Sequence, residues 1–161
     1  MKQLEKDERI LCELQGSIFE KSATEYKTSS AIFVRRYMNS EYASAMDRMG
    51  FIDRPTNEKE AFESLNEQYG ESEYGSEIYS ADELYWIGYI YRYWACLYDV
   101  PSRVIYKICN VRYMHRVYYA YHTLDPENAI ARIFEAKGIS TNEDDQIQYG
   151  IRLLRKIREK G

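Results

Sequence analysis

One pair of side chains in this sequence has a spacing that could support proton transfer. Arg116 is followed six positions later by His122, in the segment RVYYAYH. A fixed cation and an imidazole, whose usual pKa is about 6.5, can carry out acid–base chemistry when they share one face of a pocket. A simpler interpretation is that His122 helps to end a helix, where a cationic imidazole complements the helix dipole.

This spacing is similar to the R-x4-6-H motif of the HEPN ribonuclease superfamily, which also uses an all-helical scaffold. The resemblance implies that Arg116 would hold the scissile phosphate and that His122 would assist proton transfer without a metal ion, usually at a dimer interface. HEPN motifs tend to place a polar residue directly after the arginine, and Val117 stands there in this chain. Ribonuclease activity is therefore an alternative and not the leading expectation.

A second feature is the concentration of tyrosine between Tyr85 and Tyr121. Ten of the 17 tyrosines and both tryptophans fall in this segment, whereas all 5 phenylalanines lie outside it. A buried phenol needs a hydrogen-bond partner, so phenylalanine would fill a core better. We expect rings that pack on one side and present the hydroxyl to water or to a partner. The alternative is that they only line the seams between helices.

The tyrosine-rich segment is also basic, whereas the segment from Glu58 to Glu83 is acidic. The first contains five lysines and arginines against Asp99, and the second contains nine acidic residues and one lysine. Tyrosine, tryptophan and arginine dominate the energetics of protein interfaces. The pattern predicts a partner-binding surface, with an acidic arm over Glu58–Glu77 that could cover a basic cleft of the partner or fold against the basic helices. The candidate partner-binding residues are Tyr89, Arg92, Tyr93, Tyr106, Arg112, Arg116 and Tyr119.

A third feature is a predicted pair of helices joined by the short turn from Asp99 to Pro101, as in helix-turn-helix DNA-binding proteins. In the second helix Tyr106 is expected to project outward with the candidate nucleic-acid contacts, while Ile105 packs inward. Those contacts are Ser102, Arg103, Lys107 and Asn110. The formal net charge of −4 argues against a dedicated duplex-DNA protein, and an ordinary helical hairpin is the simpler interpretation.

Other classes of function find no support in the sequence. Cys12, Cys96 and Cys109 are widely spaced in apolar contexts, which is typical of buried thiols in a reducing cytosol. The cysteines and histidines lack zinc-ligand spacing, and no nucleotide-binding or hydrolase motif occurs, so we expect no metal and no cofactor. The charged N-terminus and the absence of a long apolar run predict a soluble, cytoplasmic protein with no membrane contact.

The elements that must position these residues are all predicted to be helices. The chain has 161 residues, 45% of them hydrophobic and 30% charged, which is typical of one globular domain. The alternation of half-buried strands is not sustained anywhere. We predict one domain over residues 1–161: a compact orthogonal all-α bundle of six to eight helices. At its centre we expect the Tyr/Trp-rich helix from Ser80 to Tyr98, apolar on two sides, on which Gly88 permits a close helix approach.

Capping signals define the predicted boundaries. Ser80 and Glu83 form a predicted capping box, Thr141 is expected to cap the last helix, and residues 71–79 are expected to form a mobile loop. The other helices are expected at Leu4–Ser22, Ser30–Asn39, Glu41–Met49, Asn57–Tyr69, Pro101–Cys109, Val111–His122, Pro126–Gly138 and 140–161.

Parts of the sequence resemble a family of small proteins of low-GC Gram-positive bacteria. The likeness extends over residues 4 to 136 and is carried by LCELQG followed by IFE near the start, ELYWIGYIYRYW from Glu83, and YHTLDPE from Tyr121. These proteins are encoded near toxin-like genes, including some similar to ADP-ribosyltransferases, and have no established catalytic residues. The resemblance implies an antitoxin, immunity or accessory role.

The leading expectation is therefore a non-enzymatic, antitoxin-like module that binds and neutralises a cognate protein. Nucleic-acid binding and a homodimer remain alternatives.

Overall fold

The computed structural model describes residues 3–48 and 57–160, and within these ranges every regular element is an α-helix. The all-α prediction is confirmed. The described residues form nine helices, not six to eight, because each of the nine segments marked by capping signals is a separate helix, including the short α3 (Glu41–Asp47) and α6 (Ser102–Ile108). Ser40 begins α3 by accepting the amide of Ala43 at 3.0 Å, and Asn110 separates α6 from α7 by accepting the amide of Tyr113, also at 3.0 Å.

The helix bounds follow the predicted capping signals to within a few residues. The helices are α1 (Lys6–Glu25), α2 (Ser30–Met38), α3 (Glu41–Asp47), α4 (Glu58–Tyr69), α5 (Ala81–Tyr98), α6 (Ser102–Ile108), α7 (Val111–Tyr121), α8 (Pro126–Lys137) and α9 (Glu143–Lys160). The predicted end of the third helix at Met49 lies outside the described residues.

Two predicted caps differ from the structure. Ser80 does accept the amide of Glu83 at 3.2 Å, but the Glu83 carboxylate contacts the His115 ring, so the predicted capping box is not closed. At α9 the cap is Asn142, whose side chain accepts the amide of Asp145 at 3.2 Å, and not Thr141.

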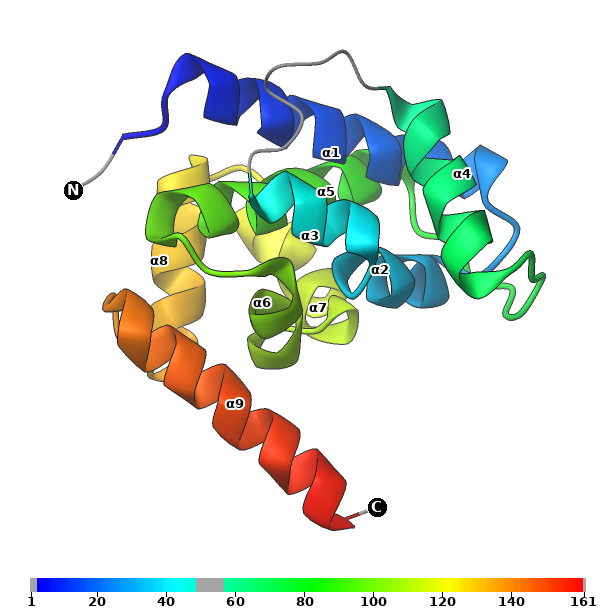
Figure 1. The fold of residues 1–161 in the computed structure, drawn as a ribbon. Coiled ribbons are helices and arrows are strands. Elements are labelled where there is room, and N and C mark those ends of the chain that lie inside the picture. The colour runs from blue at the N-terminus through cyan, green and yellow to red at the C-terminus, as the bar shows by residue number, and fades with distance from the viewer. Residues whose placement is uncertain (1–2, 49–56, 161) are drawn as a thin grey trace.

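Helix α5 packs against α1, α6, α7 and α8, with the longest contact along α1 (Figure 1). Both of its apolar stripes are largely buried. The predicted close approach at Gly88 is present, because a β-carbon there would lie 2.7 Å from the Gln15 carbonyl oxygen and from the Phe19 ring. The side of α5 that contacts α1 therefore requires a residue without a side chain at this position.

The connection from α4 to α5, residues 70–80, contains no helix and runs against the start of α2. The Ser29 amide donates to the Tyr74 carbonyl at 2.8 Å, and the Ser30 amide donates to the Glu77 carbonyl at 3.0 Å. The Tyr79 amide donates to the Ser30 hydroxyl at 2.9 Å. The predicted loop thus has three hydrogen bonds to two neighbouring residues, and its mobility stays a prediction.

Helix α9 attaches to the other helices mainly through α6, and its C-terminal end projects beyond them (Figure 1). The side chain of Gln146 is fully buried and accepts the indole N–H of Trp94 at 2.9 Å. One turn later a β-carbon at Gly150 would lie 2.5 Å from Val104, so α9 approaches α6 closely. Gln146 and Gly150 therefore anchor the first half of α9 to the core.

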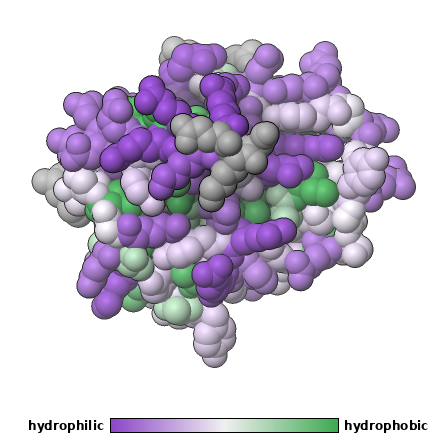
Figure 2. Space-filling view, turned by 90° about the horizontal axis from the view of Figure 1, so that it is seen from below, coloured by the Kyte–Doolittle hydropathy of each residue, from purple (hydrophilic) through white to green (hydrophobic). Residues whose placement is uncertain are grey.

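The described cysteines Cys12, Cys96 and Cys109 are buried and form no disulfide, as expected for structural thiols. Among the described residues, no helix has both the length and the apolar character needed to cross a membrane. The surface seen from below is mostly hydrophilic, with hydrophobic side chains in scattered areas (Figure 2).

Candidate functional site

The most extensive polar cluster in the interior is organised by Arg92 of α5, which is 1% exposed. We call it the Arg92 network, and it comprises Gln15, Asp47, Arg92 and Ser102. The guanidinium donates to Asp47 Oδ1 at 2.6 Å, to Gln15 Oε1 at 2.9 Å and to the Ser102 hydroxyl at 3.1 Å. Asp47 also accepts the hydroxyl of Ser102 at 2.6 Å and its amide at 2.9 Å. The network joins α1, α3, α5 and α6.

The chemistry of the Arg92 network is structural. Burial lowers the pKa of Arg92, but the Asp47 carboxylate, together with Tyr37 and Cys96, more than offsets this and the net direction is upward, so the guanidinium stays charged. The Gln15 side chain makes two further hydrogen bonds: it donates to the Gly88 carbonyl at 2.8 Å and accepts the Tyr37 hydroxyl at 3.2 Å. With these bonds made, the side chains of the network are committed to holding helices together.

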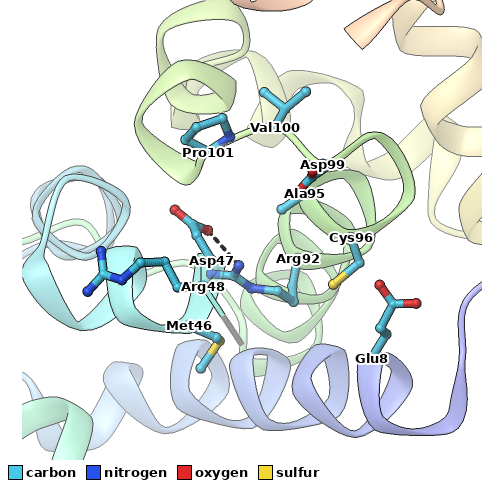
Figure 3. Close-up of a pocket in the computed structure, with 10 residues that line it drawn as sticks. All are labelled: Glu8, Met46, Asp47, Arg48, Arg92, Ala95, Cys96, Asp99, Val100 and Pro101. Carbon is cyan, nitrogen blue, oxygen red and sulfur yellow. Dashed lines mark hydrogen bonds and ion pairs between the residues drawn. The ribbon is translucent and has the colours of Figure 1, made fainter. Parts of the chain in front are cut away.

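A pocket of about 400 Å³ lies beside this network (Figure 3). Helices α1, α3 and α5 and the turn before α6 surround it, and Glu8 and Cys96 lie toward its α1 side. Both acidic and basic side chains line the pocket, and the charges of Arg92 and Asp47 neutralise each other. Cys12, which interacts with Cys96, has a pKa raised by that interaction and by burial, so its thiol is protonated and not nucleophilic.

Three of the predicted partner-binding residues are buried, and these assignments are corrected by the structure. Arg92 belongs to the Arg92 network, Tyr93 is 5% exposed and donates to Glu127 Oε1 at 2.5 Å, and Tyr106 is 9% exposed. Their helices were predicted well, but the sequence did not show which side of each helix would be covered. Tyr89 is half-buried, and its ring is stacked on that of Tyr85 and tilted against that of Tyr93.

The other three predicted residues lie together on the outside of α7. Arg112, Arg116 and Tyr119 are exposed, as is His115 between them, and these four residues form what we call the α7 stripe. Their spacing of three and four positions places them on one side of the helix. Tyr119 is 86% exposed. Neither Arg112 nor Arg116 forms an ion pair with a described residue.

The two residues of the HEPN-like motif do not converge on a pocket. They are six positions apart, which places their side chains about 120° apart around a helix. The Arg116 guanidinium lies 6.0 Å from the centre of the Tyr113 ring. His122 ends α7, and its Nδ1 donates to the carbonyls of Tyr118 and Tyr119, each at 3.0 Å. This is the simpler role that the sequence offered for His122.

The candidate nucleic-acid contacts are divided between core and surface. Ser102 is 1% exposed within the Arg92 network, and Asn110 caps α7. Arg103 is exposed and Lys107 is half-buried. Because α2, α3, α5 and α9 all contact α6, this seven-residue helix does not present the free side that a recognition helix needs in a major groove.

The acidic arm does not fold against the basic helices, which was one of the two expectations for it. Helix α4 contacts α1, α2 and α3, and not the basic helices α6 and α7 to any comparable extent. Glu58 accepts the Ser17 hydroxyl at 2.7 Å and lies 3.3 Å from Lys21 Nζ, and these contacts lower its pKa. The contact between α4 and α1 thus uses residues of α1 that the sequence did not single out.

Sequence reasoning missed Gln15, Asp47 and Arg35. Gln15 and Asp47 are polar residues on helices without a motif, and their roles depend on the approach of α5. Arg35 lines a separate pocket between α2 and α7 together with Arg112. No described group of three or more histidine, cysteine, aspartate or glutamate side chains is arranged to hold a metal ion.

Comparison with known proteins gives no relative for this chain: no family model, no curated protein and no solved structure matches it. The family resemblance drawn from the sequence stays a prediction, and function is inferred from the geometry of the surface and its pockets.

Proposed function

We propose that this chain is a non-enzymatic interaction protein that binds and neutralises a cognate protein through the α7 stripe. The observation that carries the proposal is the exposure of Tyr119 beside two arginines that have no ion-pair partner among the described residues. Exposed aromatic and arginine side chains on one helix face are the groups that most often supply binding energy at protein interfaces.

The half-buried tyrosines beside the stripe favour binding because their rings are already held in place. The Tyr118 ring meets Trp86 edge-on with centroids 5.5 Å apart, and Lys137 Nζ lies 4.2 Å from the centre of the Tyr113 ring. A ring fixed in the free protein loses little conformational freedom when a partner covers it. Trp86 also has a buried indole N–H without a hydrogen-bond acceptor among the described residues. Buried polar groups in a core normally have such a partner, so this donor is open to an acceptor from a binding partner.

The neutralising part of the proposal rests on the sequence resemblance to proteins encoded beside toxin-like genes. The partner in this proposal is a toxin with a basic substrate cleft, which the acidic arm Glu58–Glu77 would cover. Glu67 and Glu73 of this arm are exposed, which fits such a role.

The test is capture of the cognate protein from the native host with the tagged chain, followed by affinity measurement. Tyr119→Ala and Arg116→Ala should each weaken binding by about 30-fold or more, which is the effect of losing an anchor worth about 2 kcal/mol. Ile157→Ala is the control, because Ile157 is 59% exposed and lies outside both the stripe and the acidic arm. The proposal fails if no stoichiometric partner is recovered, or if the control weakens binding as much as the stripe variants.

A further inference from the structure

A second pocket, of about 370 Å³, lies where the first turns of α2 and α7 meet. Arg35 and Arg112 line it, together with Tyr106 and the apolar side chains of Ile32 and Val111. None of the described residues that line it is acidic. The backbone carbonyl of Glu77 accepts the amide of Ser30 nearby. Neither arginine forms an ion pair with a described residue. The pocket therefore holds two uncompensated positive charges.

The two arginines line the same pocket as Tyr106. Burial raises the pKa of Tyr106, while the charges of Arg35 and Arg112 act on its hydroxyl in the opposite direction. The two arginines come from different helices and line the same pocket. Two like charges that line one pocket without a described carboxylate raise the energy of the empty pocket, and an anion placed between them lowers it.

Backbone donors reinforce the positive character of this pocket. The side chains of Ser29 and Asn110 cap α2 and α7, and each accepts the third amide of its helix. The second amides, those of Ala31 and Arg112, donate to no described residue, and both residues line the pocket. Free amides at helix N-termini are favourable contacts for oxyanions. Two helix ends and two guanidinium groups thus meet around one space.

We propose that the pocket between α2 and α7 binds the phosphate group of a small phosphorylated molecule, with Arg35 and Arg112 as its cationic contacts. A planar guanidinium matches the oxygens of phosphate in two parallel hydrogen bonds. The volume exceeds that of a single phosphate and falls in the range of about 300–1,000 Å³ found for small-molecule pockets. The walls at Ile32, Tyr106 and Val111 would contact the rest of the molecule.

The experiment is an NMR titration of the full chain with inorganic phosphate and with phenyl phosphate, at constant ionic strength adjusted with chloride. We expect saturable shifts of the Ala31 and Arg112 amides. Tighter binding of phenyl phosphate would identify a phosphate ester as the ligand, and equal affinity would identify free phosphate. Arg35→Gln and Arg112→Gln should each weaken binding about tenfold or more. Arg116→Gln is the matched control, one turn further along α7 and outside the pocket, and should change affinity less than about twofold.

Absence of saturable shifts with either probe would overturn this proposal. An equal loss of affinity in Arg116→Gln would also overturn it, because it would show general attraction to a basic surface. The proposal goes beyond the proposed function and does not rest on it. Arg35 lies on α2, outside the α7 stripe, so Arg35→Gln should lose phosphate binding while leaving capture of the cognate protein unchanged.

Discussion

Arg92 shows that an arginine expected from the sequence to be an exposed interface anchor can instead be a buried structural residue. In a basic, tyrosine-rich segment an arginine is a reasonable interface anchor. In the structure it is 1% exposed and its charge is satisfied by Asp47, forty-five positions away. A buried charge is tolerated only with such a partner, because desolvation of an isolated ion is too costly. Arg92 therefore serves the fold and not a partner.

Removing one member of the buried pair should be far more damaging than removing both. Arg92→Met leaves the Asp47 carboxylate without its cation and should lower the free energy of unfolding by about 3–5 kcal/mol. Arg103→Met, at an exposed arginine, is the matched control and should change it by less than about 0.5 kcal/mol. The measurement is urea unfolding followed by circular dichroism.

The double variant Arg92→Met with Asp47→Leu separates loss of charge pairing from loss of packing. It should recover part of the lost stability, since replacing both partners of a buried pair is often nearly neutral. A double variant less stable than Arg92→Met alone would contradict the role assigned to the ion pair.

Among the helices, the contact between α1 and α5 depends on two glycines that face it from opposite sides. A β-carbon at Gly88 would lie 2.7 Å from the Gln15 carbonyl oxygen, which is backbone and cannot move alone. A β-carbon at Gly16 would lie 2.9 Å from the outer edge of the Tyr85 ring, which is half-buried and can rotate. Both positions are glycine, but we expect a larger residue to be tolerated at Gly16 and not at Gly88.

Gly88→Ala and Gly16→Ala form a matched pair that tests this contact. Gly88→Ala should lower the free energy of unfolding by about 1–3 kcal/mol, because it forces α1 away from α5. Gly16→Ala should be close to neutral, because the gain in helix propensity of about 1 kcal/mol offsets the shift of the Tyr85 ring. Thermal unfolding of both variants checks the order. Equal destabilisation would show that the two approaches are equally rigid.

At the scale of the whole molecule, α9 is joined to the other helices mainly through α6. Gln146 brings its side chain to the buried indole of Trp94, and Gly150 allows α9 to lie against α6. The residues from Arg155 to Arg158 are exposed. The predicted C-terminal capped helix is thus present, and its attachment is concentrated in its first half.

A substitution at Gln146 should therefore loosen α9 without affecting its ability to form a helix. Gln146→Leu leaves the Trp94 N–H buried without an acceptor and should cost about 1–3 kcal/mol. Gln148→Leu, on the same helix at an exposed position, should cost almost nothing. Urea unfolding read by tryptophan fluorescence, with limited trypsin digestion at the arginines of α9, tests the difference. Equal digestion rates for the two variants would contradict this attachment.

The sequence by itself determined the helical elements, because their signals are local. Ser80 marks the start of α5 and Gly138 the end of α8, and each acts within one turn of its own helix. That Arg112, Arg116 and Tyr119 share one side of α7 was also predictable, since spacing along one helix decides which residues share a side.

Only the tertiary structure decided which of the aromatic and charged residues face the solvent. Tyr93 and Tyr106 have the same type and similar surroundings in sequence as Tyr119, yet they are buried while Tyr119 is 86% exposed. Exposure depends on which helix covers a position, and Arg35 meets Arg112 only because α2 packs against the start of α7. Contacts of this kind join residues far apart in the chain, and no local propensity encodes them.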